Sequence, residues 1–276
     1  MKTNTIRLSF ILNNGLEMPA VGLGSLFAQN DGEVEGAIAA ALQAGYRKID
    51  TAAAYGNEEG VGKALQKSGI HRSDLFLTTK VWNTEQGYDK TLASFDQSLH
   101  RLQTDYVDLY LIHWPVKSKY RETYRAMEKL YAEGRVKAIG VCNFSIAQLQ
   151  DLIEHFEVVP AVNQVEMHPH LSQPELLAFA QSNQIQLEAW RPIMMGEVLQ
   201  IPDLVQIGAN HGKSAVQVAL RWLIQRGVAV IPKSVNPQRI AQNVDLFDFA
   251  LLPEEMERIE QLNQNRRLGE DLSHIE

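Results

Sequence analysis

The stretches LFLTTKVW, at residues 75–82, and DLYLIHWP, at residues 108–115, share one pattern: a short, apolar, β-prone run that ends beside a polar side chain. A third stretch, DTAAAY at residues 50–55, begins at the end of another such run. The polar residues concerned are Asp50, Tyr55, Lys80 and His113. Because the carboxyl ends of parallel barrel strands meet on one face, we expect these four side chains to form one site.

The same alternation of strand and helix patterns continues along the chain. Short β-rich runs occur at residues 20–24, 48–52, 75–81, 107–113, 136–144, 160–166, 186–192 and 228–233. Helical patterns occur at residues 32–44, 58–67, 88–102, 122–133, 146–155, 174–182, 214–225 and 253–263. Alternation of this kind is typical of either a closed barrel or an open, doubly wound sheet.

No Gly-x-Gly-x-x-Gly sequence follows an early strand, which disfavours an open dinucleotide-binding sheet. We therefore predict an α/β fold with a single (β/α)8 TIM barrel over residues 1–276. The sequence Asn13-Asn14-Gly15 lies between two apolar runs and indicates a tight turn. The prediction includes an N-terminal β-hairpin that closes the bottom of the barrel.

Composition excludes several classes of function. The net charge of −7 argues against general binding to nucleic acid, which needs clustered basic residues. The only cysteine is Cys142, so the chain has no internal disulfide or Cys-based zinc cluster, which fits a reducing compartment such as the cytoplasm. No stretch approaches the roughly 20 apolar residues that span a membrane, and the N-terminus does not have the pattern of a signal peptide.

The four residues of the predicted site suit the reduction of a carbonyl. We expect Tyr55 to be the general acid, with the Lys80 ammonium lowering its pKa and Asp50 holding that ammonium in place. His113 would orient the substrate oxygen and donate a hydrogen bond to it. Taken singly, each residue is more readily explained as part of the structure: Asp50 as a helix N-cap or turn residue, Lys80 as an ion-pair partner and His113 as a core histidine. The combination favours catalysis.

These sequence motifs resemble those of the aldo-keto reductase family. The resemblance runs through MPAVGLG, DTAAAYGNEEGVG, LFLTTKVW, DLYLIHWP, AIGVCNF, VNQVEMHP and IPKSVNPQRIAQN, and it looks like the bacterial branch that contains 2,5-diketogluconate reductases. It implies NADPH bound in an extended form and hydride transfer to a small-molecule carbonyl. The cofactor-binding positions that it implies are Ser25, Asp50, Asn143, Gln164, Trp190, Lys233, Ser234, Asn236, Arg239, Gln242 and Asn243.

Part of the cofactor site also follows from the residues themselves. Lys233 and Ser234 end the last predicted strand, and Pro237 can begin a helix with Arg239 in its first turn. A cation, a hydroxyl and helix amides then face one anion, which suits a ribose 2′-phosphate. The alternative is an exposed basic helix start. Trp82, Trp114 and His113 are expected to contact the substrate.

The chain departs from the family pattern at several places, and two of them concern the cofactor. Cys142 replaces the usual serine beside Asn143, and a thiol is a weak hydrogen-bond donor. Arg191, Met194 and Met195 occupy a stretch where many relatives have a Ser-Pro-Leu-Gly-Ser loop that touches the pyrophosphate. Arg191 could supply charge there instead.

Other functions stay open. The chain could be a cofactor-binding regulatory protein with little turnover, or a barrel isomerase or aldolase that uses Lys80 as a Schiff-base amine. Glu166, His168 and His170 could suggest a metal site, but Pro169 indicates a turn and we expect no metal. We expect a monomer; the sequence does not fix the physiological substrate or the direction of the reaction.

Overall fold

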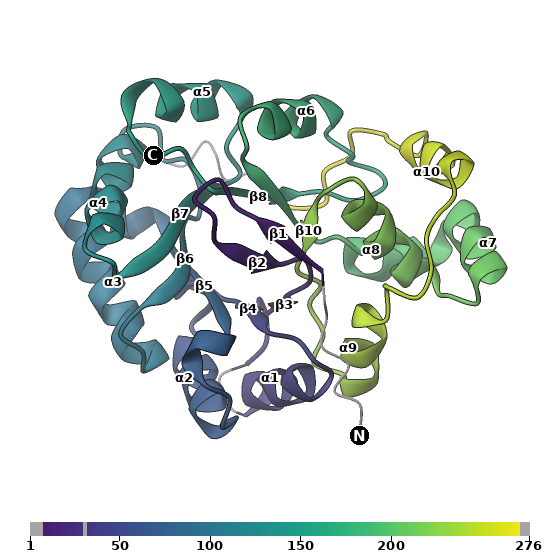
Figure 1. The fold of residues 1–276 in the computed structure, drawn as a ribbon, viewed down its shortest axis with the longest axis horizontal. Coiled ribbons are helices and arrows are strands. Elements are labelled where there is room, and N and C mark those ends of the chain that lie inside the picture. Colours follow the sequence, from purple (N-terminus) through teal and green to yellow (C-terminus); the bar gives the residue numbers. More distant parts are fainter. Residues whose placement is uncertain (1–7, 30–31, 271–276) are drawn as a thin grey trace.

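A parallel barrel forms the centre of the computed structural model, which describes residues 8–29 and 32–270. Within these residues, eight parallel strands form one sheet in the order β10-β9-β8-β7-β6-β5-β4-β3 (Figure 1). The strands are β3 (Leu23–Gly24), β4 (Lys48–Asp50), β5 (Phe76–Val81), β6 (Val107–Ile112), β7 (Val136–Cys142), β8 (Val162–Glu166), β9 (Gln186–Trp190) and β10 (Ala229–Val230). Each lies inside one of the predicted β-rich runs.

Bridges between the first and last strands close the sheet into a barrel. Val21 pairs with Val230, and Gly24 pairs with Lys233, both in parallel. The strands approach so closely here that a Cβ on Gly24 would lie 2.8 Å from the carbonyl oxygen of Ile231. Glycine is therefore required at this seam, and the predicted (β/α)8 barrel is confirmed.

Helices surround the barrel (Figure 1). They are α1 (Glu33–Gln43), α2 (Glu58–Lys67), α3 (Tyr88–Leu102), α4 (Tyr120–Ala132), α5 (Ile146–His155), α6 (Pro174–Ser182), α7 (Pro202–His211), α8 (Ala215–Gln225), α9 (Pro237–Val244) and α10 (Pro253–Glu260). Capping boxes at Ser145 and Ser214 begin α5 and α8. Four helices (α6, α7, α9 and α10) have a proline in the first turn, where the missing amide hydrogen costs little.

The N-terminal hairpin covers one end of the barrel, as predicted. Its strands, β1 (Ser9–Ile11) and β2 (Glu17–Pro19), lie across the barrel in Figure 1. Leu12 and Met18 are buried in a cluster with residues near the amino-terminal ends of the strands, including Phe76. The Asn14 side chain donates a hydrogen bond of 2.8 Å to the carbonyl of Lys137. This end is thus filled, and the opposite end is left for the site.

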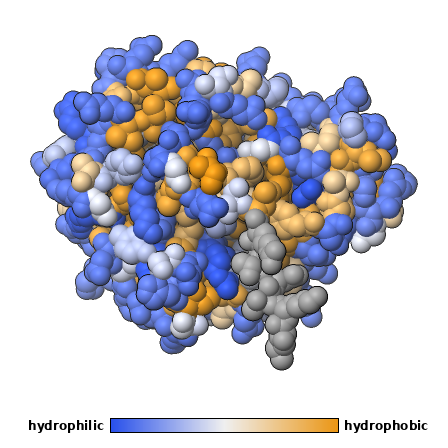
Figure 2. All heavy atoms as spheres, in the orientation of Figure 1, coloured by the Kyte–Doolittle hydropathy of each residue, from blue (hydrophilic) through white to orange (hydrophobic). Residues whose placement is uncertain are grey.

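The surface is mixed in character. Figure 2 shows hydrophilic side chains around the outline of the molecule and hydrophobic ones in separate patches toward its middle. Across residues 8–29 and 32–270, we find no helix that combines the length and the apolar character needed to cross a bilayer.

Candidate active site

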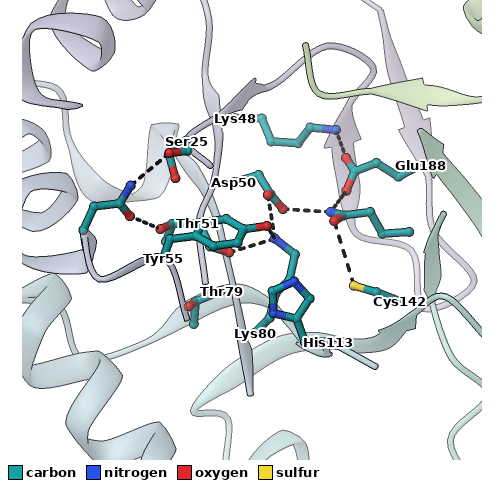
Figure 3. Close-up of polar contacts among 12 residues, drawn as sticks. Ser25, Lys48, Asp50, Thr51, Tyr55, Thr79, Lys80, His113, Cys142 and Glu188 are labelled. Atoms are coloured by element: carbon teal, nitrogen blue, oxygen red, sulfur yellow. Dashed lines mark hydrogen bonds and ion pairs between the residues drawn. The ribbon is translucent and has the colours of Figure 1, made fainter. Parts of the chain in front are cut away.

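The four residues of the predicted site meet at the carboxyl end of the barrel (Figure 3). Asp50 ends β4, Lys80 lies in β5, His113 follows β6, and Tyr55 ends the short 3-10 helix η1 (Ala53–Tyr55). The Lys80 ammonium lies 2.6 Å from Asp50 Oδ1, and it donates to the Tyr55 hydroxyl at 3.4 Å. Its third partner is the carbonyl of Thr51 at 2.8 Å.

The turn that carries Tyr55 is held in place by buried hydrogen bonds. Asn57 donates to the carbonyls of Ser25 and Ala28, at 2.9 and 3.1 Å, and accepts from Thr51 Oγ1 at 2.8 Å. Gly56 ends η1 with a φ of 67°, a conformation that favours glycine. The backbone around Tyr55 is therefore fixed by residues on two loops.

Lys80 is a charged group in a buried place. Burial alone would lower the pKa of its ammonium, but the charges of Asp50 and Tyr55 raise that pKa above its ordinary value. Burial raises the pKa of Asp50, and the nearby Lys80 opposes this shift. The 2.6 Å contact has the geometry of an ion pair inside the barrel.

The pKa of Tyr55 is shifted in the direction opposite to our prediction. Burial raises it to about 12, and the lowering by Lys80 is the smaller effect. The main physical reason is that the buried phenolate would lose its hydration; in addition, the Asp50 carboxylate, which lies 2.6 Å from the ammonium, raises the pKa and opposes the lowering by Lys80. The Tyr55 hydroxyl is therefore fully protonated at neutral pH.

His113 stands edge-on to two aromatic rings. Its ring centroid lies 5.5 Å from that of Tyr55 and 5.0 Å from that of Trp82. Burial, and secondarily the charge of Lys80, lower the pKa of His113 well below its ordinary value. The imidazole is therefore neutral at pH 7, with one N–H that can donate.

Three residues at neighbouring strand ends have the polarity that a carboxamide ligand needs. Gln164, in β8, is buried, and among the described residues its amide oxygen has a hydrogen-bond contact only with the weak thiol donor of Cys142, at 3.9 Å. Asn143 has a φ of 64° and accepts a hydrogen bond of 2.9 Å from Trp190 Nε1. The structure thus brings together the residues predicted to contact the nicotinamide.

The predicted anion site lies at the start of α9. Asn236 caps this helix by accepting from the Arg239 amide at 3.1 Å. Lys233 and Arg239 add positive charge beside the helix amides, and Arg239 is exposed. This donor set fits a phosphate group.

A cavity of about 1210 Å³ joins these groups. Of the predicted positions, it is lined by Asp50, Tyr55, Trp82, His113, Trp114, Asn143, Gln164, Trp190, Lys233, Ser234, Asn236, Arg239, Gln242 and Asn243. Lys80 lies behind Asp50 and Tyr55. Ser25 is buried beside the cavity without lining it, and among the described residues its Oγ has no hydrogen-bond partner.

Two buried acidic residues of the site were not predicted in their observed roles. Glu188, in β9, forms an ion pair of 2.5 Å with Lys48, in β4 (Figure 3). Glu166 accepts hydrogen bonds from the backbone amides of Leu268 and Gly269, at 2.7 and 3.0 Å, and so holds the C-terminal segment at the cavity. The available signal was a carboxylate inside a strand that the alternating pattern places in the barrel.

The possible metal site at Glu166, His168 and His170 is not supported. The carboxylate of Glu166 is engaged by His168 at 3.2 Å and by the C-terminal segment. Over the described part of the chain, no group of three His, Cys, Asp or Glu side chains could hold a metal ion.

Comparison with known proteins identifies the family. Residues 20–264 match the model of the Aldo/keto reductase family. The chain belongs to this family. This aldo/keto reductase is 52% identical to the glyoxal reductase of Bacillus subtilis, over 94% of each chain.

Solved structures agree. A crystal structure of an aldo-keto reductase from a Medee basin deep-sea metagenome library has a TM-score of 0.94 and 46% identity, covering 98% of this chain and 100% of that one. An aldo-keto reductase of Bombyx mori, solved in complex with NADP, has a TM-score of 0.91 and 38% identity, covering 96% and 95%.

Proposed function

We propose that the protein reduces small aldehydes or ketones to alcohols with NADPH, and that Tyr55 is the general acid. One observation carries this proposal. Contacts run from Asp50 through Lys80 to Tyr55, and the Tyr55 ring and the neutral His113 ring line the same cavity. The bound cofactor supplies a hydride to the carbonyl carbon. The protein must then supply a proton to the oxygen and a place for the substrate.

Tyr55 and His113 have different roles at the carbonyl oxygen of the substrate. The neutral imidazole donates a hydrogen bond that holds the carbonyl oxygen and stabilises the negative charge that develops there. Tyr55 then transfers its hydroxyl proton to that oxygen, and Lys80 stabilises the phenolate that remains. Asp50 acts as a positioning residue, because it fixes the ammonium and compensates its charge.

Burial of Tyr55 favours reduction over alcohol oxidation at neutral pH. With a pKa of about 12, the hydroxyl is protonated and ready to donate, whereas the phenolate that would serve as base in the reverse reaction is scarce. A strongly basic alkoxide can still take the proton from such a weak acid. The protonated Tyr55 hydroxyl therefore suits the proposed reduction of a carbonyl at neutral pH.

The preference for NADPH rests on the start of α9. Lys233, Arg239 and the capped helix amides offer a concentrated positive potential to a phosphate on the ribose, and NADH lacks that phosphate. The complex of the Bombyx mori relative with NADP supports a nicotinamide cofactor of this kind.

A small carbonyl substrate fits the walls of the cavity. Trp82 and Trp114 present flat apolar surfaces beside the proposed acid. The name of the glyoxal reductase relative supports a reactive small aldehyde as substrate.

The state of Lys80 argues against a Schiff-base aldolase or isomerase. Such an enzyme needs a neutral amine that is free to attack a carbonyl. Lys80 donates to Asp50, Thr51 and Tyr55, and its pKa is raised rather than lowered. Its ammonium is therefore unavailable as a nucleophile.

The experiment that tests the function measures NADPH consumption with a panel of carbonyls that includes glyoxal, methylglyoxal, an aromatic aldehyde and a keto sugar. Each is run with NADPH and with NADH, and alcohol formation is measured in the same samples. We expect turnover with NADPH and equal amounts of alcohol and oxidised cofactor. Quenching of NADPH fluorescence without turnover on any of these carbonyls would favour a cofactor-binding regulatory protein instead.

A further inference from the structure

The amide of Gln164 is held in one direction by two buried carboxylates. Its nitrogen donates to Asp50 Oδ2 at 2.8 Å and to Glu188 Oε2 at 2.7 Å. An amide nitrogen has two hydrogens, so its donor capacity is used completely. A flipped amide would turn its oxygen toward both carboxylates in a site of low dielectric. The oxygen of Gln164 therefore faces the cavity as an acceptor only.

Lys48 forms an ion pair with the second carboxylate. Its ammonium lies 2.5 Å from Glu188 Oε1, and both side chains are almost fully buried. Lys48 precedes Asp50 by two residues in β4, so both side chains point to the same side of the strand, into the barrel. Glu188 and Gln164 are register partners in β9 and β8. The ion pair thus lies directly beside the predicted cofactor site.

The fold makes room for this pair at Gly22. A Cβ on Gly22 would lie 2.5 Å from Cε of Lys48, so a larger residue would displace the lysine stem. The resulting chain runs from Lys80 through Asp50, Gln164 and Glu188 to Lys48, with a positive charge at each end. Two ammonium groups balance two carboxylates, and the uncharged amide lies between them.

Asn143 presents the opposite polarity. Its oxygen accepts from Trp190 Nε1, and its nitrogen donates to the carbonyl of His113 at 3.0 Å, which leaves one N–H. The cavity therefore offers an acceptor from Gln164 and a donor from Asn143. A carboxamide also has one acceptor and one donor group, so only one of its two orientations satisfies both partners.

We propose that Lys48 and Glu188 are positioning residues that fix Gln164 as an acceptor and thereby select the orientation of the nicotinamide carboxamide. This inference rests on the proposed use of NADPH. It gives a function to a buried ion pair that touches neither the substrate nor the proposed acid. When the carboxamide is held at Gln164 and Asn143, a ring flipped about the glycosidic bond would carry it away from both partners, so this anchoring also decides which face of the ring is turned toward Tyr55.

The test compares NADPH with its 3-acetylpyridine analogue, in which a methyl group replaces the amide NH2. Dissociation constants are measured by quenching of protein fluorescence, without a carbonyl substrate. For the wild-type enzyme we expect the analogue to bind about tenfold more weakly, because the buried Gln164 oxygen loses its donor. For Gln164→Leu we expect nearly equal binding of the two cofactors.

The deciding variants are Glu188→Gln and the double variant Lys48→Met with Glu188→Gln. We expect discrimination between the two cofactors to fall from about tenfold to about threefold, since a glutamine at position 188 can donate to Gln164 as well as accept from it, and the direction of the Gln164 amide is then fixed by Asp50 alone. The double variant removes both charges together, so it avoids leaving an unpaired buried charge that could prevent folding. Asp108→Asn, a buried carboxylate paired with Arg72 and Lys137, is the matched control and should keep the full discrimination.

A second measurement follows the label from NADPH deuterated on one face of C4. The wild-type enzyme should transfer hydrogen from one face of C4 only. Glu188→Gln and the double variant should transfer measurable amounts from both faces. Folded variants that discriminate like Asp108→Asn and transfer from one face would overturn the inference. A wild-type enzyme that binds NADPH but turns over none of the carbonyls would instead overturn the proposed function.

Discussion

The hydroxyl of Tyr55 lies 3.4 Å from Nζ of Lys80, a longer contact than the 2.6 Å between that nitrogen and Asp50. The lysine is thus bound first to the carboxylate and only second to the phenol. As a result, burial dominates the pKa of Tyr55, and the proposed acid is a neutral phenol over the whole physiological pH range.

Replacing Tyr55 with Phe should separate proton transfer from cofactor binding. We expect kcat for carbonyl reduction to fall by about 10²–10⁴-fold, because the proton donor is lost while the ring remains. The dissociation constant for NADPH, measured by fluorescence quenching, should stay close to that of the wild type. A parallel loss of both would mean that Tyr55 shapes the cofactor site rather than acting as the acid.

The two directions of the reaction should differ in pH dependence. His113 is neutral above its lowered pKa and Tyr55 is protonated below about 12, so kcat for reduction should be flat from about pH 6.5 to 9. Alcohol oxidation needs the phenolate, whose fraction rises about tenfold per pH unit below that pKa. Initial rates in both directions check this. A decline in reduction with a midpoint near pH 7 or 8 would show that Lys80 lowers the pKa of Tyr55 after all.

Arg239 should decide between the two nicotinamide cofactors. Arg239→Ala removes a cation from the first turn of α9 and should raise KM for NADPH by about 10–100-fold, with little change for NADH. Arg258→Ala is a suitable control, since this arginine pairs with Asp203 in α7. Equal effects of Arg239→Ala on both cofactors would contradict the proposal that Arg239 binds the ribose 2′-phosphate.

The contact between Gly269 and Trp190 should be sensitive to a single methyl group. A Cβ on Gly269 would lie 2.3 Å from Cη2 of Trp190, so Gly269→Ala must displace the ring or the C-terminal segment. We expect KM for NADPH to rise by about tenfold through the loss of the stacking surface. Gly36→Ala, where no atom lies within 4 Å of the new Cβ, is the control. Unchanged cofactor binding in Gly269→Ala would contradict the expected displacement of the Trp190 ring and would show that the C-terminal segment moves instead.

The barrel could be predicted because each strand ends in a clear change of residue type. Asp50, Lys80 and His113 follow apolar runs. The alternation of strands and helices predicts that the carboxyl ends of these strands converge on one face of a barrel. Helix α7 was not predicted, although Pro202 and Gly212 mark its two ends. Before it, Arg191, Met194 and Met195 adopt positive φ values that the sequence pattern does not indicate.

The interior charges could not be paired from the sequence. Lys48 and Glu188 are 140 residues apart, and their contact depends on which side of each strand faces the barrel axis. The pKa of Tyr55 was predicted in the wrong direction for a related reason. The sequence predicted that Lys80 lies near Tyr55. How strongly Asp50 offsets the charge of Lys80 depends on distances that are known only from the folded structure.

Lys233 belongs both to the proposed phosphate site and to the bridge with Gly24 that joins the first and last strands. A dinucleotide bound to Lys233 would stabilise the contact between the first and last strands, where the barrel closes. Protease resistance and melting temperature should therefore rise with cofactor concentration. In a cell short of the dinucleotide in both its oxidised and reduced forms, the protein would be shorter-lived, so its abundance would follow the supply of the proposed cofactor.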